Sequence, residues 1–407
     1  MNDVAPEYVK LVLAVGRHDK DYVDAFYGPA EWKSEVEAAN KPLDAIASEA
    51  DALVARLSAL PEPGDEMLRL RSNYLTRQVQ ALAARVAILR GKKMSFDEES
   101  RALYDAVAPT RTEDHFRAIR DELDSVLPGA GGAASLVERY EAWRKDFTIP
   151  REKVDPVFRA AIAECRDRTA KHMALPPGES FTVEYVTGKS WSGYNWYQGG
   201  YRSLIQVNTD FPITIDRAID LACHEGYPGH HVYNSLLEKS LVRDRGWVEY
   251  SVYPLFSPQS LIAEGSANFG IEMAFPGGER VEYEKRALYP LAGLDPARAE
   301  EFDRVRRIVD RLAYAGNEAA RRYINGEIDA AAAAKWLSEY ALYPADRAAQ
   351  RVRFFDQYRS YVINYNLGKD LVRQYVESNG GTPDDPPKRW EVFARLLSSP
   401  RLPSGLR

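Results

Sequence analysis

The stretch His224-Glu225-Gly226-Tyr227-Pro228-Gly229-His230-His231 decides how this sequence is interpreted. It contains three of the six histidines in the 407-residue chain. Histidine is the commonest metal ligand among side chains, and a glutamate beside a zinc-binding histidine is the usual partner for activating water. The stretch therefore predicts a metal site with His224 as the first ligand and Glu225 as the catalytic base.

The spacing differs from the familiar zinc-protease pattern, in which two histidines lie at positions i and i+4 of one helix. His230 lies at i+6, about 120° around an undistorted helix and about 9 Å along it, and His231 at i+7 lies about 10.5 Å along it. Pro228 cannot donate to the carbonyl of His224, so the helix must bulge or break, and the neighbouring glycines tolerate that. A bulge of two residues would return the next histidine to the position that an i+4 ligand normally occupies. We therefore predict His230 as the second ligand and His231 as the alternative.

A third ligand is expected on the next helix, because catalytic zinc usually takes three protein ligands and a water. The segment 263–268, Ala-Glu-Gly-Ser-Ala-Asn, supplies Glu264 among small residues that suit a closely packed helix. Asp220, four residues before His224, is the expected outer partner of that histidine. The alternatives are a closed structural metal site or a solvated turn, with Glu264 an ordinary surface carboxylate. A closed structural site has no use for Glu225.

Helical periodicity runs through most of the chain and predicts a mainly α fold. We expect one helical domain over residues 1–407, with two lobes around a cleft. Its N-terminal helical half covers about 1–175, and about 176–407 holds a small sheet or hairpin and the metal site. Strands are predicted at 181–186 and 203–207, and a capping box opens a helix at Ser95. The predicted helices are 7–17, 43–60, 65–89, 113–127, 136–147, 155–171, 261–274, 296–324, 330–340 and 346–375, followed by a disordered proline-rich tail after Gly380.

Several aromatic residues lie between the two predicted strands. Two interpretations have equal weight: the rings form the packing face of the sheet, or they form the wall of a substrate cleft. The residues concerned are Trp191, Tyr194, Trp196 and Tyr197.

Composition excludes some classes of protein. The net charge of -6 argues against nucleic-acid binding, which needs a basic surface. No apolar run approaches the ~18 residues of a membrane-spanning helix, and the N-terminus lacks the pattern of a signal peptide. Cys165 and Cys223 form no disulfide framework, so a reducing cytoplasm is the expected location. Cys223 adjoins His224 but is predicted to be a buried packing residue, not a ligand.

The eight-residue window resembles the signature of a bacterial domain-of-unknown-function family, number 885, which is regarded as metallopeptidase-like. Weaker similarities to that family lie, in the expected order, at 26–29, 206–208, 263–265 and 365–368. The resemblance implies a helical, cleft-bearing fold similar to the helical gluzincin peptidases. It also implies His224, His230 and Glu264 as zinc ligands and Glu225 as the base.

Other residues are predicted to contact the substrate. Tyr365 is the expected donor to the developing oxyanion, with Tyr361 as the alternative and a packing role for both left open. Arg353 is expected to receive a substrate carboxylate, in competition with three other arginines nearby. The segment 203–208 is expected to bind an extended peptide by strand addition, with Asn208 contacting the substrate. The competing arginines are Arg347, Arg351 and Arg359.

These observations together predict a zinc-dependent hydrolase of short peptides or of amide bonds in peptide-like molecules. Iron, manganese or nickel would also suit the ligand set. The alternatives are a metal-dependent hydrolase or lyase acting on a non-peptide metabolite, and a non-catalytic helical binding protein that retains the site. A serine hydrolase is weaker, because the segment 188–192 around Ser190 lacks the final glycine of a nucleophile elbow.

Overall fold

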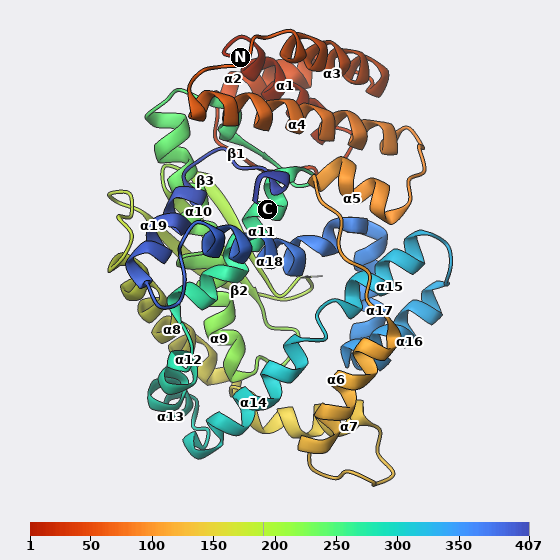
Figure 1. Cartoon of the computed structure of the whole chain (residues 1–407), viewed down its shortest axis with the longest axis vertical. Coiled ribbons are helices and arrows are strands. Elements are labelled where there is room, and N and C mark those ends of the chain that lie inside the picture. The colour runs from red at the N-terminus through yellow and green to blue at the C-terminus, as the bar shows by residue number, and fades with distance from the viewer. Residues whose placement is uncertain (190, 407) are drawn as a thin grey trace.

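Helices dominate the structure, which confirms the mainly α prediction (Figure 1). The computed structural model describes residues 1–189 and 191–406. Ser190, the serine of the weak elbow-like segment, lies outside the described residues. Within the described ranges, no helix combines the length and the apolar character needed to cross a membrane.

The first helices form a layer at one end of the long axis of the molecule (Figure 1). Two buried contacts attach this layer to the rest of the chain. Arg71 donates to both carboxylate oxygens of Glu249, at 2.6 and 3.0 Å. The Tyr74 hydroxyl donates to Gln259 Oε1 at 2.7 Å, so the layer holds the helix on which Glu264 lies. The helices are α1 (Val4–Gly16), α2 (Ala30–Ala39), α3 (Leu43–Ser58) and α4 (Glu66–Leu89).

A second group of helices extends away from this layer, and α6 and α7 lie near the opposite end (Figure 1). The capping box at Ser95 is confirmed, because Glu98 N donates to Ser95 Oγ and Ser95 N donates to the Glu98 carboxylate. Together the two bonds satisfy backbone donors that the first helical turn leaves unpaired. These helices are α5 (Phe96–Tyr104), α6 (Glu113–Val126) and α7 (Leu136–Arg144), and α8 (Val154–Ala170) follows them on the other side of the molecule (Figure 1).

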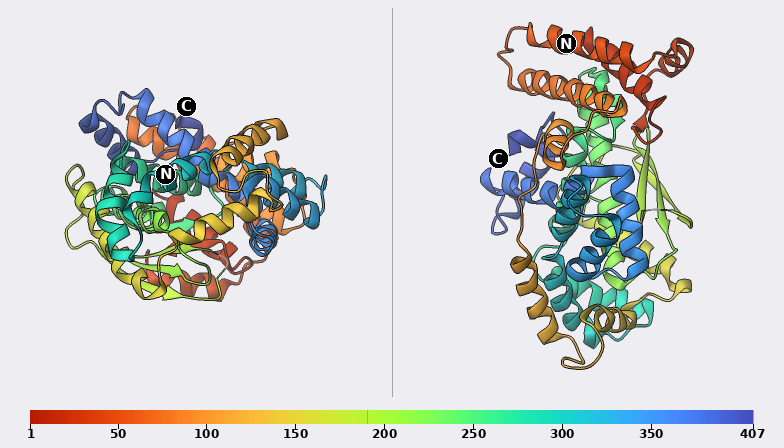
Figure 2. Two further views of the ribbon diagram at one scale, coloured as in Figure 1. Left: turned by 90° about the horizontal axis from the view of Figure 1, so that it is seen from below. Right: turned by 90° about the vertical axis from the view of Figure 1, so that its right-hand side faces the viewer.

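A three-stranded sheet precedes the metal-binding segment and lies along one side of the molecule (Figure 2). Both predicted strands are present, as β2 (Ser180–Val186) and β4 (Arg202–Asn208). They are parallel neighbours and do not form a hairpin with each other. The aromatic segment between them supplies β3 (Gly193–Gly199), which pairs antiparallel with the other edge of β4. A short second sheet joins β1 (Val23–Phe26) to β5 (Val252–Pro254).

The centre of the fold is a close contact between α11 (Pro258–Ala274) and α18 (Ile363–Ser378). A Cβ added to Gly265 would lie 2.4 Å from the backbone of Gly368, and one added to Gly368 would lie 2.6 Å from the carbonyl oxygen of Leu261. Only glycine at both positions permits this approach. The small residues after Glu264 therefore have the packing role that the sequence predicts.

Two predicted long helices are each interrupted. The segment 296–324 forms α14 (Ala299–Asp310) and α15 (Ala315–Ile324), and the Ala313 carbonyl in the break accepts from Asn366 Nδ2 at 3.1 Å. The segment 346–375 forms α17 (Ala345–Tyr358) and α18, with φ of +51° at Arg359. Buried Glu99 holds this second break, because it accepts from the backbone and hydroxyl of Ser360 and from Arg359 Nε. Tertiary contacts thus override local helix propensity.

The proline-rich tail is ordered, contrary to the prediction. It contains α19 (Pro386–Leu397), in which proline stands at the first turn and the Asp385 side chain caps Lys388 N. A proline in this position needs no backbone hydrogen-bond donor. The remaining α-helices are α9 (Ile215–Leu221), α10 (His230–Leu237), α12 (Glu279–Tyr283), α13 (Tyr289–Ala292) and α16 (Ala330–Ala341).

Candidate metal centre

The helix that carries the first histidine breaks where the sequence predicts. After α9 the chain makes a π-helical turn over Ala222–Gly226, passes through Pro228 and begins α10 at His230. Gly229 N donates to the Cys223 carbonyl at 2.9 Å. A Cβ at Gly229 would lie 1.9 Å from the His224 carbonyl oxygen. Glycine is therefore required for the close turn that brings His230 back toward His224.

Three ligand atoms converge at this turn. His224 Nε2 lies 3.1 Å from His230 Nε2 and 3.3 Å from Glu264 Oε2. His230 Nε2 lies 3.8 Å from the same Glu264 oxygen. Ligands at the ~2.05 Å bond lengths of tetrahedral zinc lie about 3.3 Å from one another. The three residues predicted as ligands are thus brought together at separations that a single zinc ion would bridge.

The hydrogen bonding of the Glu264 carboxylate leaves one of its oxygens available to a cation. Its Oε1 accepts from the Tyr361 hydroxyl at 2.9 Å, whereas its Oε2 is buried and accepts no hydrogen bond from the described residues. A buried carboxylate oxygen without a hydrogen-bond partner is costly, and a bound cation would satisfy it.

Asn268 fixes the orientation of the first histidine. Its Nδ2 donates to the Tyr365 carbonyl at 3.1 Å, so its Oδ1 faces His224 Nδ1, also at 3.1 Å. An amide oxygen only accepts, so Nδ1 carries the hydrogen and the Nε2 lone pair points at Glu264 and His230. Asp220, the predicted outer partner, is instead paired with Arg280 at 2.8 Å.

Electrostatics favour one neutral histidine at the centre. Burial, reinforced by the charge of His224, lowers the pKa of His230 to about 4. Burial also opposes charge on His224, but the carboxylates of Glu264 and Glu225 outweigh that effect and raise its pKa. His230 is thus neutral at pH 7, which is the form that binds metals.

Glu225 lies beside the three ligands, is 4% exposed and lines the cleft. Burial raises its pKa to about 7, and the nearby carboxylates of Glu264 and Asp24 add to this effect. A Cβ on Gly193 of β3 would lie 2.8 Å from Glu225 Oε1, so that glycine leaves room for the carboxylate. The neighbouring Asn195 Nδ2 donates to the Glu225 backbone carbonyl at 2.8 Å. Glu225 thus has a defined position and a pKa suited to accepting a proton.

The centre opens into a cleft of ≈ 1370 Å³, which has room for a short peptide. Trp191 and Tyr194 line it, whereas Tyr197 is buried and donates to Glu238 at 2.6 Å, and Trp196 is 39% exposed. Two of the four rings therefore line the cleft and a third is a packing residue, so the segment is divided between the two predicted arrangements.

Both candidate oxyanion donors line the cleft. The Tyr361 hydroxyl is engaged by Glu264. The Tyr365 hydroxyl makes no hydrogen bond to the described residues, and its ring lies 5.8 Å from that of Tyr361. Tyr365 is therefore the freer donor of the two.

Three predictions about the substrate are corrected. Asn208 does not line the cleft, because its Nδ2 donates to the carbonyls of Lys189 and Trp191 and its Oδ1 accepts from Asp210 N. Strand β4 is central in the sheet, so neither of its edges is free for strand addition. Arg353 is exposed outside the cleft, whereas Arg347 and Arg351 line it.

His231, the alternative ligand, points elsewhere. It is fully buried, with Nδ1 2.9 Å from Ser203 Oγ and Nε2 3.0 Å from Glu179 Oε2. These contacts attach α10 to the sheet. His230 is therefore the histidine at the centre.

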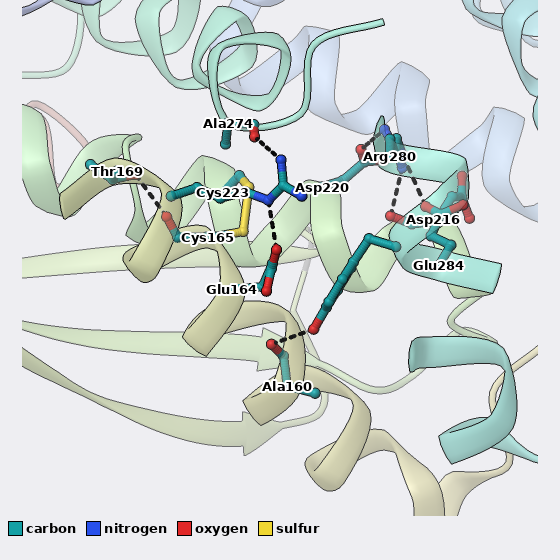
Figure 3. Close-up of a disulfide and its surroundings, with 12 residues drawn as sticks. Ala160, Glu164, Cys165, Thr169, Asp216, Asp220, Cys223, Ala274, Arg280 and Glu284 are labelled. Carbon is teal, nitrogen blue, oxygen red and sulfur yellow. Dashed lines mark hydrogen bonds and ion pairs between the residues drawn. A yellow bond between two sulfur atoms is a disulfide. The ribbon is translucent and has the colours of Figure 1, made fainter. Parts of the chain in front are cut away.

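A disulfide joins Cys165 of α8 to Cys223, the residue before His224 (Figure 3). The expectation of unpaired cysteines is wrong, although Cys223 is buried as predicted. Disulfides persist mainly in oxidising compartments, so the structure removes the argument for a reducing cytoplasm.

No protein-family model and no curated protein matches the chain. The fold is similar to that of a protein from Colwellia psychrerythraea provisionally designated a lipoprotein, with a TM-score of 0.54 and 16% identity over 89% of this chain and 68% of that one. It is also similar to a structure designated BsuCP, with a TM-score of 0.50 and 11% identity over 98% of this chain and 89% of that one. These likenesses show the fold alone.

Proposed function

We propose that this chain is a zinc-dependent hydrolase that cleaves an amide bond in short peptides or peptide-like molecules. The observation that carries the proposal is the convergence of His224, His230 and Glu264 beside Glu225 in a cleft. The resemblance of this window to family 885 supports the same chemistry.

A bound zinc ion supplies a Lewis acid that acidifies water and polarises a carbonyl. Glu225 accepts the proton of the attacking water and transfers it to the leaving amine. The Tyr365 hydroxyl donates a hydrogen bond to the carbonyl oxygen as negative charge develops there. Tyr361 and Asn268 act only by holding Glu264 and His224 in place.

The test combines metal content with cleavage of a peptide library followed by mass spectrometry. The Glu225→Gln variant is expected to keep its zinc and to lose activity by about 10²–10⁴-fold, the contribution of a general base. The matched control is Glu272→Gln, because Glu272 also lines the cleft but is paired with Lys369 and Arg373. It is expected to retain activity. Equal turnover by wild type and Glu225→Gln would contradict the proposal.

A further inference from the structure

Most arginines that line the cleft are neutralised by carboxylates. Arg306, for example, pairs with Asp303 and Asp310, and Arg373 pairs with Glu272 and Asp370. In these pairs the positive charge of each arginine is balanced by neighbouring carboxylates.

Arg347 and Arg351 of α17 are different. Neither forms an ion pair with a carboxylate anywhere in the described ranges 1–189 and 191–406. They stand one helical turn apart, so both project from the same face of α17, and both line the cleft. The cleft wall thus carries two adjacent arginines that form no direct ion pair with a carboxylate of the described residues.

Aromatic rings hold both guanidinium groups in place. Arg347 lies over the ring of Phe211 at 5.2 Å. Arg351 lies over Phe354 at 4.2 Å and over Tyr365 at 5.8 Å. A guanidinium stacked on a ring keeps its in-plane N–H donors free for a planar anion.

The surroundings of Arg347 favour the binding of an anion. Burial lowers the pKa of Arg347, and the positive charges of Arg144 and Arg217 add to this effect, which Tyr343 and Glu141 only partly offset. A bound carboxylate would offset this unfavourable crowding of like charges.

This pair lies close to the metal centre. The ring of Tyr365 lies 5.8 Å from the Arg351 guanidinium and 5.8 Å from the ring of Tyr361, and the Tyr361 hydroxyl donates to Glu264. Two aromatic rings therefore separate Arg351 from the candidate ligand. A substrate of a few residues would reach from Arg351 to the metal centre.

We propose that Arg347 and Arg351 form a subsite that binds a carboxylate of the substrate. The inference rests on the proposed function and adds its substrate class: peptides that carry a negative charge a short distance from the cleaved bond. The carboxylate is either the C-terminus, in which case the enzyme cleaves near peptide ends, or an acidic side chain.

The test measures binding by calorimetry, in zinc-loaded protein carrying Glu225→Gln to prevent turnover. Three probes are compared: N-acetyl-trialanine as the free acid, its C-terminal amide, and the amidated peptide with glutamate in the middle. The free acid or the glutamate peptide is expected to bind about 10–100-fold more tightly than the uncharged amide, since a hydrogen bond to a charged group contributes that much. Whichever probe binds more tightly identifies the source of the carboxylate.

Variants assign the preference to the arginines. Arg351→Ala and Arg347→Ala are each expected to abolish the preference for the charged probe, and Arg351→Lys to restore part of it. Arg353→Ala is the matched control, because Arg353 lies on the same helix but is exposed outside the cleft; it is expected to bind like the parent.

Equal binding of all three probes, no binding of any, or an equal loss in Arg353→Ala would overturn the inference. Because binding is measured without turnover, a preserved carboxylate preference in a protein that hydrolyses no peptide would refute the proposed function and leave the subsite standing.

Discussion

Replacing Asn268 with alanine is expected to weaken zinc binding while the protein stays folded. The Asn268 amide receives the Nδ1 hydrogen of His224 and donates to the Tyr365 carbonyl, both at 3.1 Å. The variant leaves the imidazole free to rotate, and its Nε2 then spends less time directed at Glu264.

The expected loss of zinc affinity follows from the effect that hydrogen-bond partners of ligating histidines have in metal sites. Loss of the hydrogen bond to a ligating histidine costs about 10–100-fold in metal affinity, which corresponds to about 1.4–2.7 kcal/mol. Asn268→Asp keeps an acceptor for Nδ1 and is expected to retain most of the affinity, although it loses the donor to Tyr365.

The assay is the zinc dissociation constant from competition with a fluorescent chelator at neutral pH. Asn317→Ala is the matched control, because Asn317 is a buried cleft amide that pairs with Asn366 and touches no candidate ligand. It is expected to lower stability but to leave zinc affinity unchanged. The reasoning is refuted if Asn268→Ala binds zinc as tightly as the wild type does.

Three further predictions concern the surroundings of the centre. Gly229→Ala is expected to abolish zinc binding and to destabilise the fold by about 1–3 kcal/mol, because its Cβ would lie 1.9 Å from the His224 carbonyl oxygen. A zinc titration and a urea denaturation curve check the two effects. Wild-type values in both measurements would count against the prediction. Reduction of the Cys165–Cys223 bond, which closes a separation of 58 residues, is expected to lower the free energy of unfolding by about 4 kcal/mol; denaturation with and without reductant measures this, and Cys165→Ser should match the reduced protein. Burial raises the pKa of Asp24 to about 7, so the folded state holds this proton more tightly than the unfolded state does, and stability falls as pH rises from about 4 to 7. In Asp24→Asn this part of the fall should vanish when denaturation curves at pH 5 and pH 8 are compared. A pH dependence identical to that of the wild type would be inconsistent with the assignment.

The helices and the histidines at the centre could be predicted because their signals are local. Apolar periodicity and the capping box at Ser95 depend on residues a few positions apart. Pro228 and Gly229 likewise forced a break whose consequence for His230 follows from helix geometry. Small residues after Glu264 indicated a close helix contact before the partner was known.

The errors arose where distant residues decide the local structure. Glu99 ends α17 from a position 260 residues away, and no periodicity in 346–375 records that contact. The parallel pairing of β2 with β4 and the Cys165–Cys223 bond are also long-range. Arg353 was preferred over Arg351 because sequence alone did not show which face of α17 meets the cleft.

Asn268 was visible in the segment quoted for Glu264, four residues along the same helix face. The i, i+4 spacing could have marked it as a residue near the centre. Its role nevertheless depends on the approach of α11 to the π-helical turn, which only the structure shows.

The most direct test of the central claim is a crystal structure of zinc-loaded protein with anomalous scattering recorded on both sides of the zinc edge. One anomalous peak is expected at bonding distance from His224 Nε2, His230 Nε2 and Glu264 Oε2, about 2.0–2.2 Å from each. A zinc ion bound by His231, or no peak between these three side chains at full zinc loading, would contradict the account.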